Sequence, residues 1–113
     1  MKPKENKCPA EFTLTLIGGR WKIPLLFHLQ SGSRRFSELA RALKSVTQKV
    51  LTQQLREMER DGLVARKVYA QVPPRVEYSL TDLGLSLGPV VEAMCEWGEA
   101  HGAPAPDREE ARA

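Results

Sequence analysis

The chain has 113 residues and carries 17 Lys and Arg against 14 Asp and Glu, which gives a net charge of +3. This length suits one domain that buries its own core without metal ions or disulfides, and the small basic excess fits a nucleic-acid partner but also an ordinary soluble protein. No apolar run is long enough to cross a membrane, and no apolar signal-peptide segment follows the basic start, so we expect a cytoplasmic protein without membrane contact.

Apolar residues recur at helical spacing through the first half of the chain. They predict four helices, over residues 9–17, 21–30, 37–43 and about 47–60. Pro24 falls in the first turn of the second helix, where its missing N–H costs little. Arg34 and Arg35 lead into the third helix, and residues 44–46 make a tight connection to the fourth.

The fourth predicted helix has an apolar face and a polar face. Three apolar side chains at positions i, i+4 and i+7 are expected to point inward: Leu51, Leu55 and Met58. At the start of the helix, Ser45 and Gln48 fit a capping box, while Thr47 fits an N-cap equally well. Gly62 ends the helix as the expected left-handed residue.

A β-hairpin follows the fourth helix. β-branched and aromatic residues predict strands over residues 63–69 and 75–80, joined by a loop that contains Pro73 and Pro74. The short third helix, the tight turn and the longer fourth helix form a helix-turn-helix, and the hairpin is its wing. The sequence therefore predicts a mainly α fold with a small β-hairpin wing, in the order α-α-α-α-β-β-α, which is that of a winged helix-turn-helix.

The last predicted helix covers residues 82–100 and begins at the N-cap Thr81. Pro89 lies inside it and should kink it near Leu85. A long apolar stripe runs along the helix: Leu83, Leu87, Val90, Val91, Met94 and Trp97. The stripe indicates a helix that packs on its own core and also on a second subunit. A helix buried wholly within one subunit is the alternative.

The outer face of the fourth helix carries residue types that contact base edges. Its candidate DNA-binding residues are Thr47, Gln48, Lys49, Thr52, Gln53 and Arg56. The major groove admits a helix, where Gln pairs with adenine, Lys or Arg pairs with guanine, and the Thr methyl contacts thymine. No Asp or Glu occurs between Val46 and Arg56, which favours DNA over the alternative of a merely solvated helix face.

Two further sets of polar residues are placed to contact the DNA backbone. The set on the hairpin is Arg66, Lys67, Gln71 and Arg75. The set at the start of the third helix is Arg34, Arg35 and Ser37. Cationic side chains and helix N-termini bind phosphate groups and fix the register of a protein on a duplex. A basic hairpin directly after the candidate recognition helix therefore predicts a wing that clamps phosphate or enters the minor groove.

Two cysteines, Cys8 and Cys95, are the only thiols. Cys8 precedes the first helix, where the helix N-terminus and Lys7 supply the positive potential that a reactive thiol requires. Cys8 is therefore a candidate redox sensor, with a packing residue at a subunit interface as the alternative. Cys95 lies in the apolar last helix and is expected to pack. A regulatory disulfide would join Cys8 to Cys95 or link two subunits.

No residue pattern in the chain indicates catalysis. His28 and His101 have no partners at metal-ligand spacing, and there is no glycine-rich phosphate loop, nucleophile–base pair or Cys-x-x-Cys motif. We expect no metal, no cofactor and no enzymatic activity.

Six stretches of the chain carry a family resemblance: residues 8–9 (CP), 17–22 (IGGRWK), 35–39 (RFSEL), 48–59 (QKVLTQQLREME), 61–64 (DGLV) and 73–81 (PPRVEYSLT). Together they resemble the HxlR family of bacterial winged helix-turn-helix regulators, within the MarR-like superfamily. The resemblance runs from about Cys8 to Gly98. Pro24 departs from the apolar residue expected at its position.

The resemblance implies a homodimer that is joined through its first and last helices and binds an inverted-repeat operator. The interface residues that it implies are Phe12, Leu16, Leu87, Val91, Met94 and Trp97. Some members of the family resemble sensors of oxidants or electrophiles that react through a cysteine at the position of Cys8.

The predicted organisation is a flexible arm over residues 1–7, a winged helix-turn-helix domain over residues 8–101 and a disordered tail over residues 102–113. The predicted function is sequence-specific transcriptional regulation, with double-stranded DNA, a second copy of the chain and a small-molecule or oxidant effector as partners. The alternative is a thiol or ligand sensor that acts through protein–protein contacts and does not bind DNA.

Overall fold

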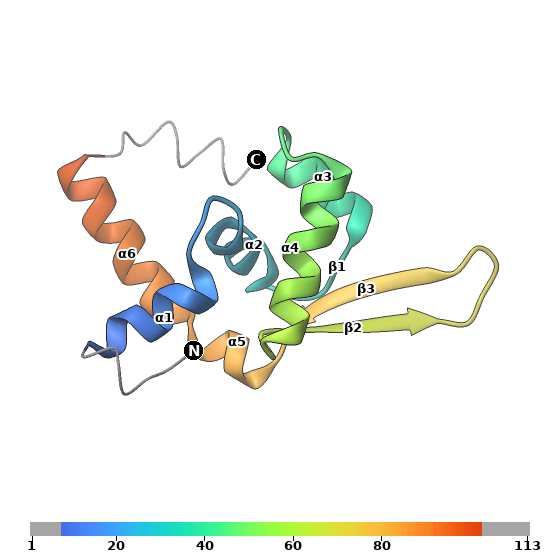
Figure 1. The fold of residues 1–113 in the computed structure, drawn as a ribbon. Coiled ribbons are helices and arrows are strands. Elements are labelled where there is room, and N and C mark those ends of the chain that lie inside the picture. Colours follow the sequence, from blue (N-terminus) through green and yellow to red (C-terminus); the bar gives the residue numbers. More distant parts are fainter. Residues whose placement is uncertain (1–7, 103–113) are drawn as a thin grey trace.

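The computed structural model describes residues 8–102, so the predicted arm and nearly all of the predicted tail lie outside the described part. The elements follow in the order α1 (Pro9–Ile17), α2 (Lys22–Leu29), β1 (Arg34–Arg35), α3 (Phe36–Leu43), α4 (Gln48–Arg60), β2 (Val64–Tyr69), β3 (Arg75–Leu80), α5 (Asp82–Ser86) and α6 (Gly88–His101). The three strands form one antiparallel sheet in the order β1-β3-β2 (Figure 1). The predicted mainly α fold with a β-hairpin is confirmed.

The core lies between α2, α3 and α4 and the base of the sheet. Side chains exposed by no more than 1% are Ile17, Leu25, Leu26, Leu29, Leu39, Leu51, Leu55, Met58 and Leu63. The inward-facing stripe predicted on α4 is confirmed by this set. Burying these apolar groups stabilises the helices far more than their intrinsic propensity does, so α4 is held by one face and leaves the other open.

The start and end of α4 settle the alternatives left by the sequence. The side-chain oxygen of Thr47 accepts a hydrogen bond from the Val50 N–H at 3.1 Å, so Thr47 is the N-cap and Ser45 belongs to the connection. Gly62 has a φ of 80°, which confirms the left-handed end of the helix. Lys44 also has a positive φ, 61°, in the tight connection before α4.

The prediction for Arg34 and Arg35 was incomplete, because these residues form a short strand. In β1, Arg34 pairs with Tyr78 and Arg35 pairs with Glu77 of β3. Helix α3 then begins one residue earlier than predicted, at Phe36. A strand of two residues has no alternation that a sequence pattern can reveal; the pairing depends on β3, which lies far along the chain.

The prediction of one kinked helix over residues 82–100 was wrong. The chain forms two helices, and Leu87 joins them by donating its N–H to the carbonyls of Gly84 and Leu85. Pro89 lies in the first turn of α6, where a missing N–H is tolerated. Gly84 packs so closely that a Cβ atom there would lie 2.2 Å from the Leu63 carbonyl oxygen, which ties α5 to the hairpin.

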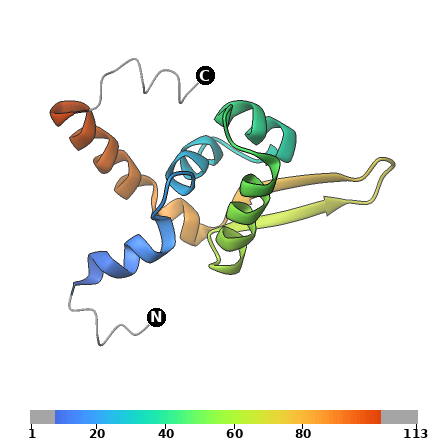
Figure 2. The same cartoon turned by 45° about the horizontal axis from the view of Figure 1, so that its top comes forward.

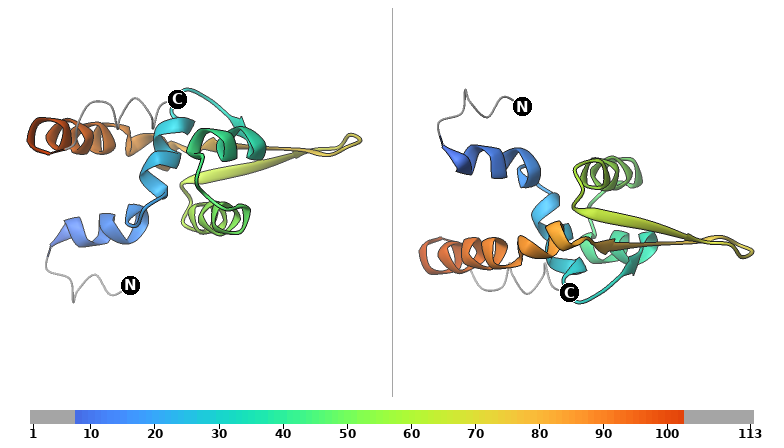
Figure 3. Two further views of the ribbon diagram at one scale, coloured as in Figure 1. Left: turned by 90° about the horizontal axis from the view of Figure 1, so that it is seen from above. Right: turned by 90° about the horizontal axis from the view of Figure 1, so that it is seen from below.

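The elements divide the described part into a winged body, residues 20–80, and an arm region, residues 8–19 and 81–102. The β2–β3 hairpin projects from one side of the body, and α1 and α6 project from the other (Figures 1 and 2). Helices α1 and α4 lie on the same side of the plane of the hairpin (Figure 3). The two regions therefore offer separate surfaces at opposite ends of the molecule.

Candidate nucleic-acid interface

The exposed face of α4 gathers the predicted recognition residues. Gln48, Lys49, Gln53 and Arg56 are exposed, and Thr52 is half-buried. A shallow hollow runs along the helix and is lined by Gln48, Lys49, Thr52, Gln53, Arg56, Glu57 and Arg60. Thr47, the N-cap, is exposed at the start of the same helix. The structure thus places five of the six predicted residues in one hollow along α4 and the sixth, Thr47, at the start of the helix.

The sequence did not predict the role of one carboxylate in this hollow, Glu57. Its Oε1 pairs with Nζ of Lys22 at 2.5 Å, and its Oε2 accepts a hydrogen bond from Nε2 of Gln53 at 3.4 Å. The hydrogen bond from Lys22 holds the pKa of Glu57 below its usual range, against the smaller opposing effect of burial. Glu57 is therefore a partnered anion. Lys22 and Glu57 are 35 residues apart, and no local pattern links them.

The wing carries cations that are held in place by neighbouring side chains. Arg66 lies 3.6 Å from a carboxylate oxygen of Glu59, and Arg75 lies 3.3 Å from one of Glu77. The Arg75 guanidinium also stacks on the ring of Tyr69, 4.4 Å from its centroid, and Lys67 approaches the same ring at 5.0 Å. Tyr69 was not predicted as a site residue, although it orients two of the predicted cations. Its cation–π contacts reduce the conformational freedom of both.

The tip of the wing is fully open to solvent. Gln71 is exposed, and the neighbouring Val72 is 99% exposed. An apolar side chain this accessible contributes nothing to the core of its own subunit. The tip therefore reaches beyond the rest of the body, on the side opposite to α1 and α6 (Figure 1).

The residues predicted beside α3 divide into two kinds. Arg34 is half-buried and donates to Oγ of Ser31 at 2.8 Å and to the Ser33 carbonyl at 3.1 Å, so its guanidinium braces its own loop. Arg35 and Ser37 are exposed. A second shallow hollow joins α3 to the start of α4 and is lined by Phe36, Ser37, Ala40, Arg41, Lys44, Val46 and Gln48. It adds two cations, Arg41 and Lys44, that the sequence analysis did not single out.

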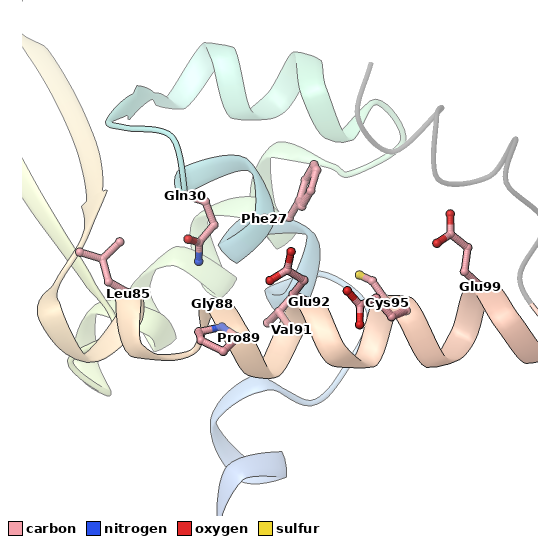
Figure 4. Close-up of a pocket in the computed structure, with 10 residues that line it drawn as sticks. Phe27, Gln30, Leu85, Gly88, Pro89, Val91, Glu92, Cys95 and Glu99 are labelled. Atoms are coloured by element: carbon pink, nitrogen blue, oxygen red, sulfur yellow. The ribbon is translucent and has the colours of Figure 1, made fainter.

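Charge separates the winged body from the arm region. Residues 20–80 contain twelve Lys and Arg and five Asp and Glu, whereas residues 8–19 and 81–102 contain five Asp and Glu and neither Lys nor Arg. A deeper hollow between α2 and the α5–α6 segment shows this clearly, because Glu92, Glu96 and Glu99 lie along it (Figure 4). Carboxylates repel phosphate, so the surface suited to nucleic acid is the one formed by α4, α3 and the wing.

The residues predicted at a subunit interface divide between the surface and the core. Phe12, Met94 and Trp97 are 48%, 42% and 67% exposed, and Leu16 is half-buried against the core. Leu87 and Val91, in contrast, are buried within their own subunit at 9% and 4% exposure. The exposed apolar surface also includes Leu83 and Val90, which belong to the stripe predicted on the last helix, and Leu14 and Leu85, which the sequence analysis did not assign to an interface.

The two thiols differ in accessibility. Cys8 is the N-cap of α1 and is exposed. Cys95 is half-buried, packs against the core and lines the hollow between α2 and α6 (Figure 4). Within residues 8–102, no three His, Cys, Asp or Glu side chains group as metal ligands, and none of the helices is both long and apolar enough to span a bilayer.

A helix-turn-helix whose second helix is anchored by one apolar face, followed by a two-stranded wing, defines a winged helix-turn-helix protein. The comparison with family models is specific, since the HxlR-like helix-turn-helix model matches residues 16–106. The chain belongs to this family of transcriptional regulators, of HxlR and MarR type.

Known proteins similar to the chain include regulators and solved structures. The HTH-type transcriptional regulator YybR of Bacillus subtilis (strain 168) is 54% identical over 99 residues, which covers 88% of this chain and 79% of YybR. The structure of the redox regulator HypR in its reduced form is 56% identical in sequence and superimposes with a TM-score of 0.80. The match covers 82% of this chain and 92% of the HypR chain. Diamide-treated YodB from B. subtilis is 32% identical with a TM-score of 0.72, covering 88% and 99% of the two chains.

Proposed function

We propose that the protein is a sequence-specific DNA-binding regulator that acts as a homodimer on an inverted-repeat operator. Helix α4 enters the major groove, and the wing and the start of α3 contact the backbone. The observation that carries the proposal is the exposed face of α4, on which Gln48, Lys49, Gln53 and Arg56 are exposed to solvent. The carboxylate that lines the same hollow, Glu57, is paired with Lys22.

The homodimer is supported by the arm region. Phe12, Met94 and Trp97 expose large apolar side chains on the projecting helices α1 and α6 (Figure 2), and such exposed apolar surface is typical of protein–protein interfaces. A two-fold dimer joined there would point two copies of α4 away from the junction, and such dimers contact half-sites about 34 Å apart. This arrangement would match an operator whose two halves are inverted.

The test uses duplexes that the full chain selects from a random-sequence library. Arg56→Ala should weaken binding to a selected duplex by about tenfold to hundredfold if Arg56 contacts a base edge. Binding to random duplexes should fall much less. Selection of no common sequence by the wild-type chain, or negligible affinity for any duplex, would refute the proposal and favour the alternative, in which α4 docks on a protein.

Redox control through Cys8 is a second part of the proposal. It is supported by the exposure of Cys8 at a helix N-terminus and by the similarity to a redox regulator, HypR. We expect diamide to change the affinity of the wild-type chain for a selected duplex and to have no effect on Cys8→Ser. Cys95→Ser is the matched control, and its response separates a Cys8–Cys95 disulfide from a disulfide between two Cys8 thiols. An identical response of wild type and Cys8→Ser would exclude Cys8 as the sensor.

A further inference from the structure

Among residues 8–102, Lys22 is the one Lys, Arg, Asp or Glu that is buried, with 8% of its surface exposed. Burying an ammonium group is costly unless it is paired, and Lys22 is paired with Glu57 of α4, whose side chain is 27% exposed. Glu57 also lines the hollow on the exposed face of α4. The pair therefore links a buried cation to that face.

The second carboxylate oxygen of Glu57 links the Lys22–Glu57 pair to Gln53 on the exposed face of α4. Oε2 accepts the hydrogen bond that Nε2 of Gln53 donates at 3.4 Å. An ionised carboxylate accepts hydrogen bonds and donates none, so the reverse orientation would place the Gln53 carbonyl oxygen against an anion. The ion pair with Lys22 fixes the position of this carboxylate and lowers the pKa of Glu57 further from neutrality. The orientation of the Gln53 amide is therefore determined by its neighbours.

We propose that Lys22 and Glu57 are positioning residues for base readout, which hold the Gln53 amide with its carbonyl oxygen and its second N–H facing the major groove. This pair of groups complements adenine, which presents the N6 amino donor beside the N7 acceptor. Guanine presents two acceptors, O6 and N7, so the carbonyl oxygen of the held amide would face an acceptor there instead of a donor. The inference rests on the proposed function, because it requires α4 to lie in the major groove.

The experiment begins by finding the base pair that Gln53 contacts. Duplexes selected by the full wild-type chain are mutated one base pair at a time, and the position whose preference disappears in Gln53→Ala is taken as its contact. At this position the wild-type chain should prefer adenine to guanine by about tenfold or more. An absence of any selected sequence would overturn the proposed function itself. A sequence-selective chain with no position that depends on Gln53 would overturn only the present inference.

Glu57→Gln is the decisive variant. A glutamine at this position both donates and accepts, so the Gln53 amide is free to turn, and we expect the preference for adenine to fall to about twofold. Affinity for random duplexes should rise, because one negative charge near the phosphates is removed. A variant that was merely misfolded would lose both quantities together. Unchanged adenine preference in Glu57→Gln would overturn the inference.

Two further variants serve as controls. Glu59→Gln removes the same charge from the same helix but from a residue that lies near Arg66, so it should raise affinity for random duplexes and keep the adenine preference. Lys22→Met removes the partner of Glu57 and should lose the preference, whereas Lys22→Arg should restore it. A loss of preference in Glu59→Gln equal to that in Glu57→Gln would assign the effect to charge alone and contradict the role of Lys22.

Discussion

The winged body and the arm region use their apolar residues and their charges in opposite ways. In the body, the large apolar side chains of α2 and α4, such as Leu26 and Leu51, are completely buried and the surface carries an excess of cations. In the arm region, Trp97 and Phe12 are exposed. This region contains Asp and Glu but neither Lys nor Arg. The body thus buries its large apolar side chains by itself, whereas the arm region leaves several exposed, as the proposed homodimer requires.

This difference separates two kinds of recognition. Long-range attraction to phosphate depends on net local charge and falls with salt. Association through apolar surface depends on the area removed from water and is nearly independent of salt. The cationic surface of the winged body and the apolar surface of the arm region lie at opposite ends of the molecule. Substitutions in one region should therefore change one kind of binding and leave the other unchanged.

The largest expected effect comes from the core of the body. Leu51→Ala should lower the free energy of unfolding by about 2–5 kcal/mol, because it leaves a cavity where α4 is anchored. Urea denaturation followed by circular dichroism measures this change. Val68→Ala, on the outer side of the wing where Val68 is 55% exposed, is the control and should stay within about 0.5 kcal/mol of the wild type. Equal losses would mean that the wing contributes to the core.

A comparable effect on association is expected from the arm region. Trp97→Ala should raise the dissociation constant of the homodimer by about thirtyfold, the loss typical of a central interface aromatic. Sedimentation equilibrium measures the constant. Val72→Ala removes an even more exposed apolar side chain from the wing tip and should leave it unchanged. A dimer weakened by Val72→Ala and not by Trp97→Ala would place the subunit contact in the wing.

The body was more predictable from sequence than the arm region. The inward stripe of α4 repeats at helical spacing, and the hairpin strands consist of β-branched and aromatic residues, so local pattern determined both. The helix break at Leu87 depends on packing between Gly84 and Leu63, which no local pattern contains. The stripe on the last helix was correctly apolar. Which of its members face the core and which face solvent depends on that break.

The candidate site was predictable as a set of residues but not as a network. The polar face of α4 follows from helix geometry once the apolar face is known. The contacts that hold those residues are long-range: Lys22 pairs with Glu57 across 35 residues, and Tyr69 contacts Arg75 across the hairpin. Sequence patterns of one element therefore identify the groups on the exposed face, while the orientation of those groups is determined by other elements.

A smaller effect should come from a single cation of the wing. Arg75→Ala should weaken binding to selected and random duplexes about equally and reduce the slope of log affinity against log salt by about one, because one phosphate contact is lost. Fluorescence anisotropy at several salt concentrations gives both values. Gln53→Ala is the control, since a neutral side chain should leave the slope unchanged. An unchanged slope in Arg75→Ala would remove the wing from the phosphate contacts.

The smallest expected effect links the charge of the body to its stability. The pKa of Glu57 is held below its usual range in the folded protein, because Lys22 donates a hydrogen bond to its carboxylate. Its contribution is therefore complete above the unfolded-state pKa and is lost as pH falls through the folded value. We expect Glu57→Gln to cost on the order of 1 kcal/mol at pH 7, because the side chain is partly exposed to solvent.

This cost should shrink as the pH falls through the folded-state pKa of Glu57, because the wild-type carboxyl group then becomes protonated as well. Denaturation at a series of pH values measures the difference between the two proteins. In a Lys22→Met background the same substitution should show a weaker dependence on pH, since the hydrogen bond that lowers the pKa is missing. A difference that grew on acidification would mean that Glu57 is destabilising as an anion, and Lys22 would then be too weakly coupled to it to hold Gln53.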